Sequence, residues 1–203
     1  MAGRDVADVL GKARELLDTA SLGVDMTSGD PRNRRVGLQN VATFGRSVTF
    51  VLQNLRSVVD TEAFDEWYQP QVALMKANAV CVYFKDLRTE ILKQGTPRSS
   101  QVATIDFMTP ERQARMMANP PPGAKSFFIG DNVGGNGWLV DMPDGTESKF
   151  YVDLPDDLGI TVTWHLPNHP MPDIPIDELC RQYVEILTAI MVSAEHHFGS
   201  KPS

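Results

Sequence analysis

The segment CVYFKDLRTEILKQG, from Cys81 to Gly95, carries the pattern from which the first half of the chain can be interpreted. Its apolar residues recur at spacings of three and four, which predicts an amphipathic helix that ends at Gly95. Successive helical residues are rotated by about 100°, so Arg88 projects only about 40° from Phe84 and falls on the apolar face. Because arginine keeps its charge, its partial burial requires a carboxylate, carbonyl oxygens, an anionic ligand or a partner chain.

The same helical spacing extends upstream from this segment. One apolar stripe runs over residues 6–17 and stops near Gly23, and a longer stripe runs over residues 41–59. Asp60 or Thr61 can cap a third helix, in which Pro70 either starts a new helix or bends a continuing one, and Asn78 offers a further break. Residues 1–98 are therefore predicted to form an antiparallel bundle of helices with short connections.

The second half of the chain has a different period. Alternating segments bounded by turn residues predict strands near residues 103–107, 126–129, 138–142, 149–154 and 160–166, with a hairpin turn at Asp144-Gly145. A short helix is expected to start at Thr109, and a long amphipathic helix runs over residues 176–198. We therefore predict an α+β fold with an N-terminal antiparallel helical bundle, a small antiparallel sheet of four to five strands and a long C-terminal helix packing back. The expected domains are residues 1–98 and 99–203, packed as one unit.

Composition narrows the class of protein. The chain has 203 residues, of which 42% are hydrophobic, so it can bury a core without disulfides. Cys81 and Cys180 lie within apolar helical patterns, which favours a reducing cytoplasmic location. The first residues are too polar for a signal sequence, and no apolar run reaches the ~18 residues that span a bilayer. We expect a cytoplasmic protein with no membrane segment and no cofactor.

Charge is unevenly distributed along the chain. The net charge of −7 opposes non-specific binding to nucleic acid. Residues 1–98 contain 13 basic and 12 acidic side chains, whereas residues 99–203 contain 6 basic and 14 acidic ones. A bound anion is thus expected in the first half, where the candidate ligands are Arg32, Arg34, Arg35, Arg46, Lys85 and Arg88. Trp67 and Tyr68 could stack bases beside this patch, although their helical spacing favours core packing.

The predicted bundle and the pair Arg88-Thr89 in its last helix resemble the HEPN superfamily, small helical domains that often act as metal-independent ribonucleases. In that family a histidine follows the arginine and its polar neighbour a few residues later. Lys93 or Gln94 occupies this position here, and lysine does not exchange protons near neutral pH unless it is strongly desolvated. The resemblance therefore implies a catalytically degenerate module that binds RNA, a nucleotide or a protein partner, and that forms a homodimer.

Three alternatives remain open from the sequence. In the first, the protein is a metal-independent ribonuclease in which Arg88 stabilises phosphorane charge, Lys93 assists and Thr89 orients the reacting group. In the second, it is a structural or immunity-type interaction protein whose acidic second half contacts a basic partner. In the third, Arg88 forms an ion pair within the fold, with candidate partners Asp65, Glu66 and Glu90.

The remaining motifs do not predict further chemistry. The glycine-rich stretch 127–138, continued through Asp144-Gly145 to residues 151–155, resembles a segment of uncharacterised bacterial proteins, which suggests a bacterial or phage origin. It lacks the Gly-Lys-Ser/Thr that follows a phosphate-binding loop, and we interpret it as a hairpin connection. The four histidines do not reproduce the spacing of a helical zinc site with a supporting glutamate, so no metal is expected.

Overall fold

The helices begin and end at residues suited to those positions. In the computed structural model, which describes residues 5–29, 33–95, 100–105, 108–131, 135–154 and 159–199, Asp5 caps α1 (Val6–Ser28) by accepting a hydrogen bond from the Asp8 amide. Asp60, one of the two residues expected to cap the third helix, caps α3 (Thr61–Ala77). Asn78, which was expected only as a break, caps α4 (Ala79–Gln94). Gly95 ends α4 with a φ of 80°, a left-handed conformation that glycine adopts without strain.

Two of the predicted helix boundaries are wrong. The first helix continues past Gly23 to Ser28, because Gly23 serves a helix crossing. A Cβ atom on Gly23 would lie 2.8 Å from the carbonyl oxygen of Gly37 in α2 (Arg34–Leu52), so this glycine allows the two backbones to approach closely. The second helix ends earlier than predicted, because a short 3-10 helix, η2 (Gln53–Ser57), follows α2.

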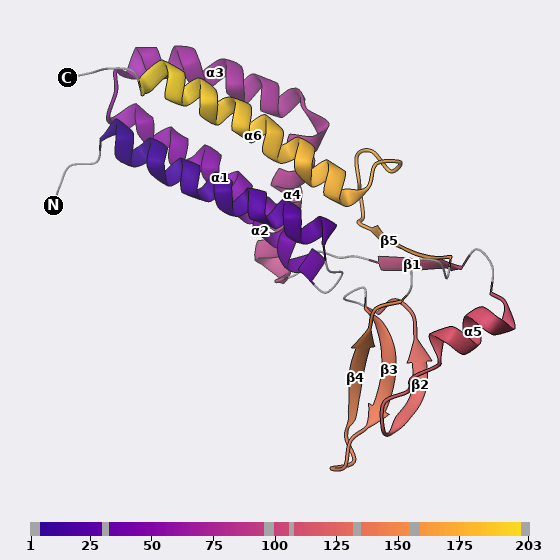
Figure 1. Cartoon of the computed structure of the whole chain (residues 1–203). Coiled ribbons are helices and arrows are strands. Elements are labelled where there is room, and N and C mark those ends of the chain that lie inside the picture. Colours follow the sequence, from indigo (N-terminus) through magenta and orange to yellow (C-terminus); the bar gives the residue numbers. More distant parts are fainter. Residues whose placement is uncertain are drawn as a thin grey trace. The chain divides into compact units, whose positions relative to one another are not determined.

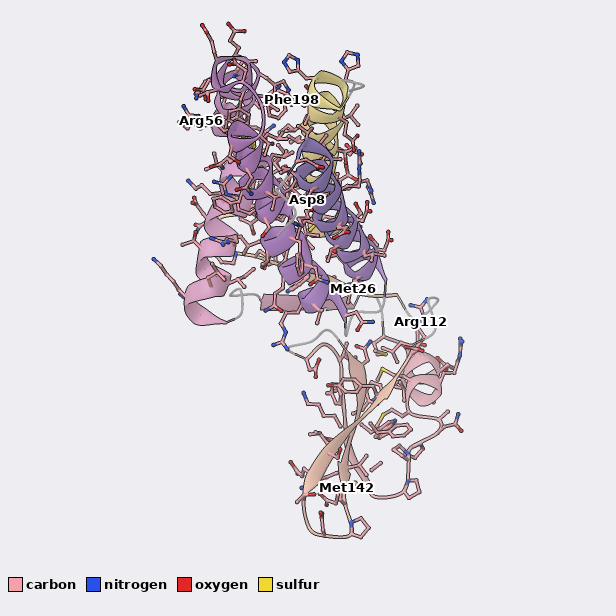
Figure 2. The ribbon with its side chains drawn as sticks, turned by 90° about the vertical axis from the view of Figure 1, so that its left-hand side faces the viewer. Asp8, Met26, Arg56, Arg112, Met142 and Phe198 are labelled. Atoms are coloured by element: carbon pink, nitrogen blue, oxygen red, sulfur yellow. The ribbon has the colours of Figure 1, made fainter. Side chains whose placement is uncertain are left out.

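The last helix, α6 (Ile176–Phe198), packs back on the other helices, as expected. Phe84 of α4 stacks on Tyr183 of α6 with a ring separation of 4.4 Å, and both side chains are buried. Arg14 of α1 donates to Glu195 over 3.1 Å. Figure 1 shows α1, α2 and α6 running alongside one another, and Figure 2 places Phe198 at the end of this helical unit opposite Met26.

Trp67 and Tyr68 belong to a packed aromatic cluster. Trp67 is 8% exposed and donates from Nε1 to the hydroxyl of Ser193 over 3.0 Å. Phe64 stacks on Tyr68 at 5.0 Å, and Phe198 meets Trp67 edge to face at 5.2 Å. The prediction of core packing is therefore confirmed for Trp67, whereas Tyr68 is half-buried and contributes through its stack on Phe64.

The described strands form two antiparallel sheets, so the prediction of a single sheet of four to five strands is wrong. β1 (Ser100–Ile105) pairs with β5 (Ile160–His165), and β2 (Ala124–Phe128), β3 (Asn136–Asp141) and β4 (Glu147–Val152) form a second sheet. The short helix α5 (Pro110–Met116) is capped by Thr109. Asp144-Gly145 makes the predicted turn between β3 and β4, beside Met142 (Figure 2). Periodicity identifies strands but not their pairing partners, which explains the error.

The chain divides into two compact units, residues 1–97 with 168–203 and residues 98–167. The expected boundary near residue 98 agrees with this division, but the grouping of the last helix with the strands does not. The apolar face of α6 needs a large apolar surface, and α1, α2 and α4 provide it. Among the described residues, no helix combines the length and the apolar character that crossing a bilayer requires.

Candidate functional site

Two arginines from different helices meet at one aromatic ring. The guanidinium carbon of Arg46 lies 4.6 Å from the centroid of the Phe50 ring, and that of Arg88 lies 5.5 Å from the same centroid. Arg46 and Phe50 are one turn apart on α2, whereas Arg88 comes from α4. Phe50 is 43% exposed, so this group faces solvent. We call Arg46, Phe50 and Arg88 the arginine–phenylalanine site.

Arg88 is half-buried, as its position on the helix predicted. Its Nε atom is buried and has no hydrogen-bond acceptor among the described residues, and no carboxylate in this part of the chain pairs with its guanidinium. Asp65, one of the expected partners, pairs instead with Arg56 over 2.8 Å. Within the described residues, therefore, an internal ion pair does not account for Arg88.

Arg46 is held in place by its own helix. Its Nη1 atom donates to the hydroxyl of Thr49 over 2.9 Å, and that hydroxyl donates to the Arg46 carbonyl over 2.9 Å. Thr49 is 1% exposed, so this anchor is rigid. The Phe50 ring adds a cation–π contact on the solvent side. The orientation of the guanidinium is thus fixed, while most of its N–H donors stay available to a ligand.

The groups near Arg46 hold their protons at neutral pH. Burial raises the pKa of the Cys81 thiol to about 11, although the charge of Arg46 opposes the rise. Burial also raises the pKa of Tyr68 and of Tyr183, again against the influence of Arg46. None of these three side chains can act as a general base near neutral pH.

The residues assigned to the ribonuclease alternative do not converge on one point. Thr89 is exposed, and its hydroxyl donates to the carbonyl of Lys85 over 3.0 Å, one turn earlier on α4. Lys85 is exposed and pairs with Asp86 at 3.2 Å. Lys93 is exposed in the last turn of α4, and a rise of about 7.5 Å along the helix separates it from Arg88.

The predicted anion-binding arginines fall into two places. Arg34 and Arg35 lie in the first turn of α2, and a rise of about 17 Å along that helix separates Arg35 from Arg46. The Nε atom of Arg34 is buried without an acceptor among the described residues. Arg32, which the sequence placed in the same patch, lies outside the described residues. The expected single patch is thus two clusters at different heights along α2.

Sequence reasoning missed Phe50. The buried stripe of α2 passes through Val48 and Leu52, and Phe50 lies off that stripe, so periodicity alone gives it no role. The signal that could have found it is the spacing of four residues from Arg46, which places two side chains on the same helix face. An aromatic residue one turn from an unexplained arginine is typical of a cation–π pair.

A separate hollow of about 840 Å³ lies between α1 and α6. Its walls are mainly apolar with charged side chains at the rim, and they are formed by Ser21, Val24, Asp25, Arg181, Val184, Glu185, Thr188, Ala189, Val192, Ser193 and His196. In the part of the chain that the structure describes, no group of three or more His, Cys, Asp or Glu side chains is arranged to hold a metal ion.

Comparison of the chain with models of protein families, with curated proteins and with solved structures finds no match.

Proposed function

We propose that the helical unit binds single-stranded RNA through the arginine–phenylalanine site and does not cleave it. The observation that carries this proposal is the meeting of Arg46 and Arg88 at the half-exposed ring of Phe50, with no carboxylate partner for either guanidinium among the described residues. RNA offers phosphates that accept hydrogen bonds from guanidinium groups and bases that stack on aromatic and guanidinium planes.

The pattern-level resemblance to HEPN domains supports the same ligand. The charge distribution also supports it, because the basic residues are concentrated in the first half of a chain that is acidic overall. Catalysis is not part of the proposal, since Cys81, Tyr68 and Tyr183 all retain their protons and the position of the family histidine carries Lys93 or Gln94. Homodimerisation remains a prediction, to be measured by sedimentation at several protein concentrations.

The test is the fluorescence anisotropy of a labelled single-stranded RNA at low salt. We expect Arg88→Gln to weaken binding by about 1.5 to 3 kcal/mol, or roughly 10- to 150-fold, as the loss of charge-assisted hydrogen bonds predicts. Arg56→Gln is the matched control, because it removes an exposed arginine that already pairs with Asp65. Equal losses in both variants, or no RNA binding by the unmodified protein, would contradict the proposal.

The unmodified protein and an Arg88→Ala variant test the ribonuclease alternative. RNA is incubated with the protein in the presence of a chelator and then separated by length. Cleavage that Arg88→Ala abolishes would establish the metal-independent nuclease, whereas intact RNA in every sample agrees with binding alone. The ratio of absorbance at 260 and 280 nm of the purified protein reports any nucleotide carried through purification.

A further inference from the structure

The basic side chains of the helical unit divide into two groups by their ion pairing. Five of them pair with a carboxylate, namely Lys12, Arg14, Arg56, Lys85 and Arg181. Within the described residues, the others form no ion pair, and they are Arg34, Arg35, Arg46, Lys76, Arg88 and Lys93. All of this second group except Lys76 belong to α2 or α4. The uncompensated positive charge is therefore concentrated on two neighbouring helices.

Part of this charge gathers at one end of the two helices. Gln39 of α2 donates from Nε2 to the carbonyl of Gly95 over 2.9 Å, which fixes the end of α4 beside the first turns of α2. Arg35 precedes Gln39 by one turn, and Lys93 precedes Gly95 by two residues. We call Arg34, Arg35 and Lys93 the end cluster.

Helix stability does not explain the two arginines of the end cluster. They occupy the first turn of α2, which contains no acidic residue. The dipole of a helix favours anions in its first turn, so cations there are unfavourable unless an anion compensates them. Arg34 also has a buried Nε atom without an acceptor among the described residues. The positive charge at this end of α2 is therefore not balanced by an acidic residue in the same turn.

The surface between the two clusters suits a flexible chain. Leu92 of α4 lies between Arg88 and Lys93 in sequence and is 59% exposed. Val36 and Phe50 of α2 are 41% and 43% exposed. A ligand can therefore make apolar contacts both beside the end cluster and at the arginine–phenylalanine site. The rise of about 17 Å from Arg35 to Arg46 is too long for one phosphate group to bridge.

We infer that the end cluster binds a second phosphate of the same single strand whose first contact is the arginine–phenylalanine site, so that the ligand is an oligonucleotide and not a free nucleotide. This inference rests on the proposed function. It requires the ligand to be several nucleotides long, and it assigns the binding of the second phosphate to Arg34, Arg35 and Lys93. The bases between the two phosphates lie over the exposed side chains of Val36, Phe50 and Leu92, of which the Phe50 ring can stack with a base.

The experiment compares two probes, uridine monophosphate and an oligouridylate of about eight nucleotides, a length within the range of single-strand sites. We expect the oligonucleotide to bind at least about tenfold more tightly than the mononucleotide. The double variant Arg35→Gln/Lys93→Gln should lose that advantage and keep the mononucleotide affinity. Its plot of log affinity against log salt should be shallower by about 0.7, the contribution of the one phosphate contact that the end cluster makes.

Lys76→Gln is the matched control, because Lys76 is exposed and without an ion pair in the described residues but lies on α3. Unchanged oligonucleotide binding by the double variant, together with weakened binding by Arg88→Gln, would overturn this inference and leave the proposed function intact. An equal effect of Lys76→Gln, or displacement of the oligonucleotide by polyglutamate at equal charge, would also overturn it. If the unmodified protein bound neither probe, the proposed function itself would be contradicted.

Discussion

Phe84 and Phe50 show that one residue type serves stability at one position and ligand contact at another. The side chain of Phe84 is fully buried and stacks on Tyr183. That of Phe50 is 43% exposed and lies against the guanidinium groups of Arg46 and Arg88. A buried ring contributes through packing and loss of apolar surface, whereas an exposed ring between cations contributes little to folding.

The two phenylalanines therefore give opposite predictions. Phe84→Ala should lower the free energy of unfolding by about 3 to 5 kcal/mol, because it leaves a cavity next to Tyr183. Phe50→Ala should change that free energy by less than about 1 kcal/mol and should weaken RNA binding by about 1 to 3 kcal/mol. Urea denaturation and RNA anisotropy measure the two effects. A loss of stability in Phe50→Ala equal to that of Phe84→Ala would show that the ring belongs to the core.

The partial burial of Arg88 could be predicted from the sequence, but the residues that contact its guanidinium could not. The angle between Arg88 and Phe84 on a helix is local geometry, so the half-buried guanidinium could be predicted. Its neighbour Phe50 is distant in sequence and on another helix, and no local pattern places those two helices together. The same reason explains why the expected partner Asp65 pairs with Arg56 instead.

Helix crossings decide the architecture at the scale of elements. Gly23 and Gly37 face each other where α1 meets α2, and a Cβ atom on Gly37 would lie 2.6 Å from the carbonyl oxygen of Gly23. From the sequence, Gly23 was predicted to end the first helix. An isolated glycine is typical both of a helix end and of a close helix crossing, so the pattern does not distinguish the two cases. Helix caps are local features: Asp60 was one of the two predicted capping residues of α3, and Asn78, predicted as a break, caps α4.

Gly23→Ala should lower the free energy of unfolding by about 1 to 3 kcal/mol, because backbone atoms of α2 must move away from the added methyl group. Gly11→Ala is the matched control on the same helix. A Cβ atom on Gly11 meets nothing within 4 Å, so this substitution should raise stability by about 0.5 to 1 kcal/mol through helix propensity. Urea denaturation of both variants measures whether the free energy of unfolding falls for Gly23→Ala and rises for Gly11→Ala. If both substitutions raised it, the α1–α2 crossing would not require a glycine at residue 23.

At the scale of the whole molecule, the sequence predicted an α+β chain with a long last helix, but not the division of its strands. β1 pairs with β5, and the segment that contains α5 and the three-stranded sheet lies between them in sequence. Pairing across such a long segment depends on the folded unit and not on local alternation. The helical unit consequently contains both ends of the chain, residues 1–97 and 168–203.

This topology predicts that the segment between β1 and β5 can be removed. Ile105 and Ile160 are the last paired residues of the β1–β5 ladder, so an Asn-Gly linker between them has the length of a two-residue hairpin turn. After residues 106–159 are replaced with Asn-Gly, the circular dichroism signal of the remaining helices and the urea concentration at which they unfold should be unchanged. The removed segment contains nine acidic and four basic residues, so RNA binding at low salt should be equal or tighter.

The shortened chain separates the proposed function from the interaction-protein alternative. If RNA is bound by α2 and α4, the ligand contacts remain, because every residue of the arginine–phenylalanine site and the end cluster lies outside the deletion. If the acidic half contacts a basic protein partner, that contact is lost while the helices stay folded. Loss of RNA binding by a shortened chain with intact helices would show that residues 106–159 also hold the ligand, and unfolding of the helices would show that the two units depend on each other for stability.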